Sequence, residues 1–272
     1  MKKSLIMSVA PVIAMIVAAN GAVIAEFNFQ SLGTSGTLAT DISGNNHNAT
    51  FTNAATLVAD NPFGQVGGMS LRPNTTDATA RMANPGTINA DTGWTMEAWV
   101  KLGDYVGNQA SACGSIVAVQ DTTSANQSLI LAITAAGVPG ISYYQSQVGS
   151  EVLTNYGTPI AANTWTHIAA VYNLGGWAMT LYVNGVSTGA VGVHGWNAGP
   201  LTAASIGDDG PFAISYGPLT GNILLDDVGL FNNQLAPSEL GFSNPFPIPE
   251  PASLALLLGV VGLCGVATRQ RR

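Results

Sequence analysis

Carboxylates are the side chains that could do chemistry in this 272-residue chain, which has 15 Asp and Glu. The adjacent pair Asp226-Asp227 lies in the run NILLDDVGLF, which has the composition of a strand. In a regular strand Asp226 shares a face with Val228 and Leu230, so it is in phase with the core. A buried carboxylate is costly unless it is paired, protonated or bound to a cation. Asp226 is therefore a candidate metal ligand, and a carboxylate bonded to loop amides at a strand end is the alternative.

The three histidines give no zinc signal, because none has a second His or Cys at metal-ligand spacing. His167 alternates with Trp165 and Ala169, which predicts a hydrogen-bonded core or rim residue. Asp208-Asp209 in IGDDGPF is a weaker candidate loop for a cation, with a solvated turn as the alternative.

A glycoside hydrolase needs two carboxylates that face each other across the scissile bond. Glu97 has no acid two or four residues away, and the adjacent Asp226 and Asp227 point to opposite faces of a regular strand. The chain also has no G-x-S-x-G, no H-E-x-x-H and no phosphate-binding glycine loop. We therefore expect no enzyme, although acids from different strands could still converge.

The charge balance of the central part excludes a basic surface. Between residues 26 and 248 the only basic side chains are Arg72, Arg81 and Lys101, against 14 acids, for a net charge of −11. We expect no nucleic-acid partner, because such partners need a basic patch. Of the two cysteines only Cys113 lies in this part, so no disulfide can form within it.

The first 25 residues, MKKSLIMSVAPVIAMIVAANGAVIA, have the order of a secretory signal peptide: two lysines, an apolar stretch, then small residues. Val23 and Ala25 are compact side chains before Glu26, so we expect cleavage after Ala25. A retained N-terminal anchor is the alternative, although about 15 apolar residues are few for a span.

The elements that must position the acids are strands. Short β-branched or aromatic runs alternate with turn signals, many with a period of two, and no stretch has a sustained helical period. The hairpin MTLYVNGVSTG has Asn184-Gly185 at its turn, and APSEL, with Pro237, is the one short helix expected. This pattern predicts a single antiparallel two-sheet β-sandwich. The expected strands are EFNF, MSLR, WTMEAWVKL, GSIVAVQ, SLILAIT, GISYYQ, TWTHIAAVY, WAMTLYVNG and NILLDDVGLF.

Four stretches, in this order, resemble a laminin-G-like jelly roll of the concanavalin A-like type. They are DISGNNHNAT, WTMEAWVKL, TWTHIAAVY followed by LYVNG, and NILLDDVGLFNNQLAPSEL, and the resemblance covers residues 26–242. It implies a sandwich whose concave face or rim loops bind sugars or proteins. It also implies a structural calcium in some members, here held by Asp41, Asn46 and Asp226. Calcium takes six to eight oxygen ligands, which such a loop supplies. The alternative is that Asp41 begins a turn by bonding its own backbone.

Aromatic side chains are the candidates for sugar contacts, because a flat ring stacks on the apolar face of a pyranose. The candidates are Trp99, Tyr144, Trp177 and Trp196. Trp99 is in phase with Glu97 and Lys101, away from the core face, and coverage by loops is the alternative.

The tail 243–272 resembles the PEP-CTERM sorting signal: Pro249, Glu250 and Pro251, an uncharged segment 252–268, then Arg269, Arg271 and Arg272. The uncharged segment has 17 residues, the short limit for a transmembrane helix. The arginines would hold its end on the cytoplasmic side during a transient inner-membrane insertion. The resemblance implies cleavage by an exosortase-type membrane protease, and a permanent anchor is the alternative.

The sequence thus predicts an exported, non-catalytic β-sandwich at the cell surface or in the extracellular matrix, where it binds polysaccharide or other matrix components. Two alternatives stay open. One is a purely structural or adhesive surface protein without a small ligand, and the other is a glycoside hydrolase with an unrecognised site.

Overall fold

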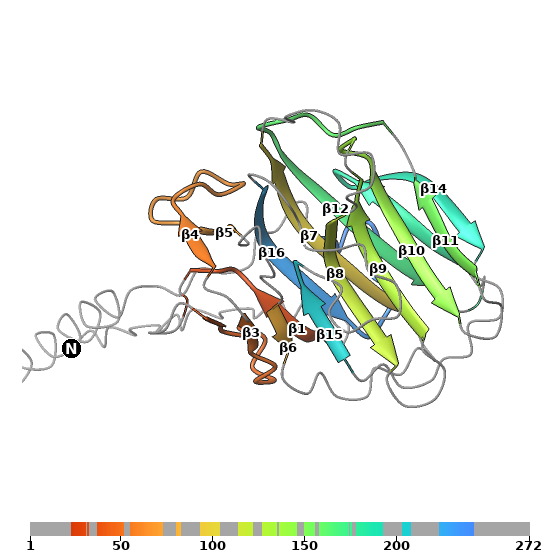
Figure 1. The fold of residues 1–272 in the computed structure, drawn as a ribbon, viewed down its shortest axis with the longest axis horizontal. Coiled ribbons are helices and arrows are strands. Elements are labelled where there is room, and N and C mark those ends of the chain that lie inside the picture. Colours follow the sequence, from red (N-terminus) through yellow and green to blue (C-terminus); the bar gives the residue numbers. More distant parts are fainter. Residues whose placement is uncertain are drawn as a thin grey trace, which may run out of the picture.

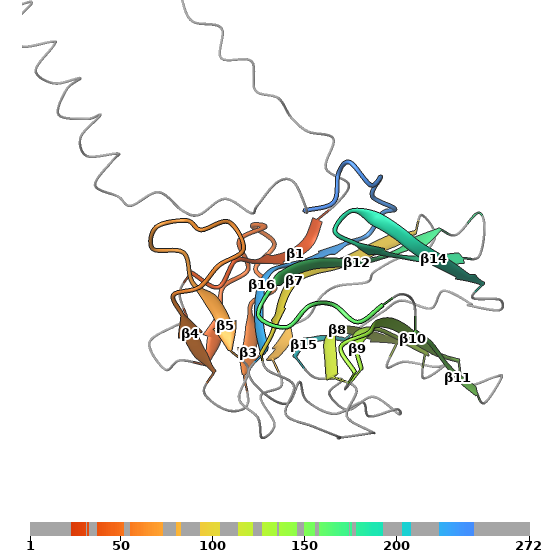
Figure 2. The same ribbon diagram turned by 90° about the horizontal axis from the view of Figure 1, so that it is seen from above.

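The protein is described by a computed structural model. Its described residues are 23–30, 32, 37–51, 55–72, 80–82, 93–103, 114–121, 127–134, 136–145, 150–155, 158–173, 175, 178–192, 203–207 and 223–241. In these residues there is no helix and every strand pair is antiparallel. The strands form two layers, best separated in Figure 2. The expected all-β antiparallel sandwich is confirmed.

The first layer, sheet A, has eight strands, and β1 (Val23–Phe27) pairs with β16 off the main path. Its central strands β12, β7 and β16 lie side by side in Figure 1. The order is β14 (Val186–Gly192), β13 (Ala178–Val183), β12 (Trp165–Asn173), β7 (Trp94–Leu102), β16 (Ile223–Phe231), β5 (Ser70–Arg72) and β4 (Thr56–Val58).

The second layer, sheet B, also has eight strands. The order is β11 (Ser150–Asn155), β10 (Pro139–Gln145), β9 (Gln127–Ile133), β8 (Gly114–Asp121), β15 (Ala203–Ile206), β6 (Ala80–Met82), β3 (Ala49–Phe51) and β2 (Leu38–Ala39).

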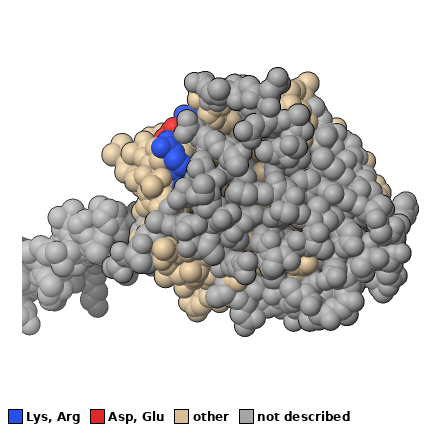
Figure 3. Space-filling view, in the orientation of Figure 1, with Lys and Arg blue, Asp and Glu red and all other residues tan. Residues whose placement is uncertain are grey.

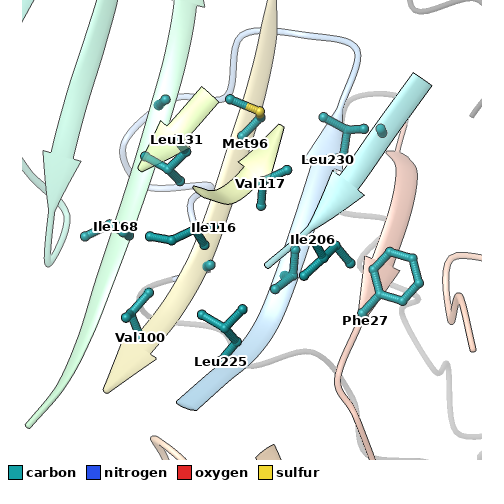
Figure 4. Packing of buried hydrophobic residues seen from close by; sticks show 14 of the residues in the cluster. Phe27, Met96, Val100, Ile116, Val117, Leu131, Ile168, Ile206, Leu225 and Leu230 are labelled. Atoms are coloured by element: carbon teal, nitrogen blue, oxygen red, sulfur yellow. The ribbon is translucent and has the colours of Figure 1, made fainter. Parts of the chain in front are cut away.

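Strand alternation places one apolar face of each sheet in a shared core. In β7 the buried core residues are Trp94, Met96, Ala98, Val100 and Leu102, as the period of two predicts. Figure 4 shows side chains of sheet A, such as Met96 and Leu225, packed against side chains of sheet B, such as Val117 and Leu131. Each fully buried aliphatic side chain of this kind contributes about 1.5–3 kcal/mol to stability.

A β-bulge in β16 overturns the expected phase of Asp226. Asp226 pairs with Trp99, and Gly229 pairs with Glu97, so β16 carries one residue more than β7 in this interval. Asp227 takes up the extra residue with a φ of +42°. The core therefore contains Leu225 before the bulge and Val228 after it, while Asp226 lies beside Trp99 on the outer face of sheet A. The prediction that Asp226 shares a face with Val228 was wrong, because the alternation breaks at the bulge.

Two local expectations had different outcomes. The Asn184-Gly185 hairpin is confirmed: both residues have positive φ angles, +50° and +73°, and Val183 pairs with Val186. The helix expected at APSEL was wrong, since residues 236–240 form a turn in which the Glu239 N–H donates to the Ala236 carbonyl. No helix among the described residues is long and apolar enough to cross a membrane.

Candidate functional site

The best candidate site lies on the outer face of sheet A, at one end. There Lys101 of β7 lies between Leu224 of β16 and Trp165 of β12 in one cross-strand row. Leu71 pairs with Leu225 in the antiparallel β5–β16 pair, so Arg72 extends the same row beside Leu224. One row thus brings an aromatic ring and two of the three basic residues of the body together.

Asp60, which follows β4, contacts two side chains of this row, Lys101 and Trp165. Its Oδ2 lies 2.6 Å from the Lys101 Nζ, and its Oδ1 accepts a 2.9 Å hydrogen bond from the Trp165 Nε1–H. Burial raises the pKa of Asp60, but the hydrogen bonds from Lys101 and Trp165 and the charge of Lys101 outweigh it, so the pKa lies below its usual value. We call Asp60, Arg72, Lys101 and Trp165 the rim site.

The rim site is open to solvent. The side chains of Lys101 and Asp60 are 23% and 32% exposed, Trp165 is half-buried and Arg72 is exposed. Figure 3 shows basic and acidic side chains next to each other at the edge of the molecule that carries β4 and β5 in Figure 1. A partly exposed indole beside a carboxylate, an ammonium and a guanidinium can stack on a sugar ring and bond its hydroxyls. No step of covalent chemistry follows from these groups.

The β4–β5 loop that carries Asp60 is held in one conformation. Asn61 Oδ1 accepts the N–H groups of Phe63 and Gln65 at 3.2 and 2.8 Å, and Asn61 Nδ2 donates to the Gln65 carbonyl at 3.0 Å. The Phe63 ring packs edge-on against Trp99 with 5.2 Å between centroids. Gly68 has no room for a Cβ, which would come within 2.6 Å of Asn61 Nδ2. The loop therefore presents Asp60 in a fixed position.

The sequence analysis did not find the rim site. Asp60 is far from Lys101 and Trp165 in sequence, and only the fold brings the three together. The available signal was the turn-forming stretch DNPFG, whose Asn, Pro and Gly are typical of an ordered loop.

A second polar group on the same outer face, formed by Glu97 and His167, is shielded from solvent. Glu97 Oε2 lies 3.2 Å from His167 Nε2 and accepts the Gly241 N–H at 2.9 Å. The two side chains are 1% and 0% exposed. Trp99 covers the pair: its ring lies against His167, and its Nε1–H donates to the Gly241 carbonyl at 3.4 Å. His167 is thus a buried, paired residue, as expected, and this group is not open to a polysaccharide.

Burial also raises the pKa of two acids nearby. The pKa of Glu26 is raised to about 7, mainly because the side chain is buried and in addition because Glu97 and Asp41 are negatively charged. The pKa of Asp226 is raised to about 9, mainly because the side chain is buried and in addition because Asp227 is negatively charged. A hydrogen bond from the Asp227 N–H lowers this pKa but does not outweigh the two other effects. Asp226 therefore avoids the cost of a buried charge by holding a proton at neutral pH.

The DISGNN loop has the turn geometry that was the alternative to a calcium loop. Asp41 Oδ1 accepts the N–H groups of Ser43 and Glu26 at 2.9 and 3.1 Å, and Oδ2 accepts that of His47 at 2.9 Å. Asn46 is exposed with a φ of +62°. Among the described residues no three His, Cys, Asp or Glu are placed to hold a metal. Calcium binding by Asp41, Asn46 and Asp226 stays a prediction.

The predicted sugar platforms fall into two groups. Trp99 is 7% exposed and lies under Phe63 and Gly241, so it offers no open ring face, in line with the alternative of coverage by loops. Tyr144 lies in β10, where it pairs with Ser128 and Glu151, but its side chain lies outside the description. Trp177, Trp196, the loop at Asp208-Asp209, Pro249, Glu250, Pro251, Arg269, Arg271 and Arg272 lie outside the described residues.

The fold of the described residues is a two-layer antiparallel β-sandwich. A model of the Laminin_G_3 family, described as the concanavalin A-like lectin/glucanases superfamily, matches residues 74–241. This range is more than half of the chain, and the chain belongs to this family. The expected laminin-G-like, concanavalin A-like fold is thereby confirmed. No curated protein matches the chain.

Solved structures share the fold at low sequence identity. Domain 4 of AbnA, a GH43 extracellular arabinanase from Geobacillus stearothermophilus in complex with arabinotriose, has a TM-score of 0.57 and 16% identity, covering 81% of this chain and 97% of that one. The botulinum neurotoxin serotype D ligand-binding domain in complex with N-acetylneuraminic acid has a TM-score of 0.57 and 13% identity, covering 80% of this chain. The binding domain of Paraclostridial Mosquitocidal Protein 1 has a TM-score of 0.56 and 16% identity, also over 80% of this chain. This chain spans 49% and 50% of those last two chains.

Proposed function

We propose that this protein is an exported, non-catalytic β-sandwich that binds glycans at the cell surface or in the extracellular matrix. The observation that carries the proposal is the rim site, where the half-buried Trp165 indole is anchored by Asp60 beside Lys101 and Arg72. Two structural neighbours, the arabinanase domain and the neurotoxin domain, were solved with a sugar bound. Their ligands support a saccharide as the class to test first.

The burial of three acids among the described residues supports a binding role over hydrolysis. Hydrolysis needs a pair of carboxylates about 5–9.5 Å apart that flank an accessible bond. Glu97, Asp226 and Asp227 are all buried, at 1%, 3% and 6% exposure. At the rim site, Asp60 is the one carboxylate, and it is already paired with Lys101.

Export and sorting belong to the same proposal. The signal-peptide pattern takes the chain across the inner membrane, and the PEP-CTERM-like tail holds it there for an exosortase-type protease. The net charge of −11 between residues 26 and 248 suits a soluble body among surface polysaccharides.

Glycan-array binding of the exported protein tests the proposed function. Wild type should bind a subset of the glycans, with arabino-oligosaccharides and sialylated glycans included among the probes. Trp165→Ala should weaken that binding roughly tenfold or more, which is about 1.4 kcal/mol, because the stacking ring is lost. Tyr182→Ala is the matched control, since Tyr182 is a partly buried aromatic on the same sheet, away from the rim site.

Circular dichroism must show that both variants are folded before their binding is compared. Wild type that binds no glycan would favour the structural or adhesive alternative. Binding that survives in a folded Trp165→Ala variant would remove the rim site from the proposal.

A further inference from the structure

The first strand of the sandwich begins before the bond at which the signal peptide was expected to end. β1 runs from Val23 to Phe27, so cleavage after Ala25 would remove Val23, Ile24 and Ala25 from it. These three residues take part in the fold in three separate ways.

The first way is burial. Ile24 is 7% exposed and Ala25 is fully buried, and both belong to the main hydrophobic core. Val23 packs on the other side, against the cluster that contains Phe231 and Leu235. Deleting a buried aliphatic residue leaves a cavity and exposes its neighbours to water.

The second way is the sheet ladder. Val23 pairs with Phe231 and Ala25 pairs with Leu230, so these residues hold the end of β16. β1 is the only described strand on this side of that part of β16, because β5 pairs with β16 at Leu225. Without them the end of β16 would have an unpaired edge.

The third way is the DISGNN loop, whose polar side chains hold the backbone of β1. Asn45 Nδ2 donates to the carbonyls of Val23 and Ile24 at 2.7 and 3.1 Å, and Ser43 Oγ donates to the Ile24 carbonyl at 3.5 Å. Asp41 Oδ1 accepts the Glu26 N–H at 3.1 Å. Cleavage after Ala25 would remove every acceptor that Ser43 and Asn45 have on this strand.

We propose that the maturation site of this protein lies upstream of Val23, so that the mature domain keeps the whole of β1. The step is hydrolysis of one peptide bond, with water as the co-reactant. Two bonds there have small or compact residues at the two positions that signal cleavage requires. They follow Ala19, with Val17 before it, and Gly21, with Ala19 before it. The mature chain then begins at Asn20 or Ala22. This proposal rests on the export in the proposed function.

The test is N-terminal sequencing and intact mass of the full-length protein after expression with an active secretory pathway. The mature N-terminus should be Asn20 or Ala22. A start at Glu26 would overturn the proposed maturation site and leave export intact. A start at Met1 in protein from every fraction would overturn both the maturation site and the signal peptide.

A pair of variants makes the test independent of folding, because the measured quantity is whether the precursor is cut. The double variant Ala19→Leu/Gly21→Leu removes the small residues at both upstream bonds, so the precursor should accumulate uncut. The control Val23→Leu alters only the bond after Ala25, and it should be processed like wild type. The opposite pattern, with loss of processing only in Val23→Leu, would place the cut after Ala25.

Discussion

At the scale of single residues, the outer face of sheet A accommodates four acids in one region with few basic partners. Glu97 is matched by His167 and by the Gly241 N–H, and Asp41 is matched by backbone N–H groups. Burial raises the pKa of Glu26 to about 7 and that of Asp226 to about 9, so at neutral pH Asp226 is protonated and Glu26 is partly protonated. Protonation is therefore part of how this face is stabilised.

The raised pKa values predict that the protein is more stable in acid than in alkali. A carboxyl whose pKa is higher in the folded than in the unfolded state contributes its full stability below the unfolded value. That contribution is lost as pH rises through the folded value, about 7 for Glu26 and about 9 for Asp226. The melting temperature should therefore fall between pH 5 and pH 9.5.

Thermal unfolding followed by circular dichroism at several pH values measures this effect. Glu26→Gln should flatten the fall around neutral pH, and Asp226→Asn should flatten it at alkaline pH. Glu239→Gln is the control, because it makes the same Glu-to-Gln change at an exposed side chain. A melting temperature that rises from pH 5 to pH 9.5 would contradict the predicted protonation of these acids.

Sequence reasoning reached the buried state of His167 but not the surroundings of Asp226 or Asp60. Period-two alternation puts His167 on the same face as Trp165 and Ala169, and this holds because β12 pairs with β7 without a break. It fails for Asp226, because a bulge adds one residue whose position no composition rule marks. Asp60 could not be assigned, since its contacts with Lys101 and Trp165 depend on the tertiary packing of a loop.

At the scale of elements, the segment after β16 acts as a cover over the outer face of sheet A. Leu235 and Leu240 are 3% and 1% exposed and pack with Phe231. The hydroxyl of Thr95 donates to the Asn233 carbonyl at 2.9 Å and accepts the Leu235 N–H at 3.0 Å. The segment ends at Gly241, which is held by Glu97 and Trp99. Side chains on the outer face of β7 thus hold the cover segment in place, and side chains on its inner face belong to the hydrophobic core.

The cover gives Glu97 a structural role that a variant can measure. Glu97→Ala should lower the free energy of unfolding by about 3 kcal/mol, because it leaves buried His167 and the buried Gly241 N–H without the carboxylate. Chemical denaturation measures this loss, and hydrogen exchange should become faster in residues 232–241. Glu97→Gln keeps an acceptor for Gly241 and should lose less. An Ala variant as stable as wild type, with unchanged exchange, would mean that the cover does not depend on Glu97.

The positions of the longer strands along the chain and the Asn184-Gly185 turn were the features that the sequence predicted well. All nine expected strands correspond to strands of the structure, and Asn184-Gly185 forms the expected turn because both residues tolerate positive φ. The short strands β2, β4 and β6 have two or three residues each, too few to show a period. APSEL carries helix signals but is too short to close more than one turn.

At the scale of the whole molecule, both ends of the described body lie on the same side of sheet A. β1 pairs with β16, and the cover segment follows directly from β16, so the two ends are neighbours in Figure 2. The DISGNN loop secures the start of the body at Val23, and Glu97 secures its end at Gly241. The described strands therefore lie between the predicted tail and a signal segment that ends upstream of Val23, and cuts at those two places would leave these strands whole.

This arrangement predicts that the tail is cut without effect on the fold. Intact mass of the protein from the cell surface or the medium should show loss of the segment after Pro249, Glu250 and Pro251, because these residues match the sorting motif. Glu250→Ala should leave the tail in place and keep the protein in the membrane fraction. Pro245→Ala, which lies between Gly241 and the motif, is the matched control and should be processed normally. Surface or secreted protein that still ends in Arg272 would show that the tail is not a cleaved sorting signal, and membrane-bound protein that ends in Arg272 would point to a permanent anchor.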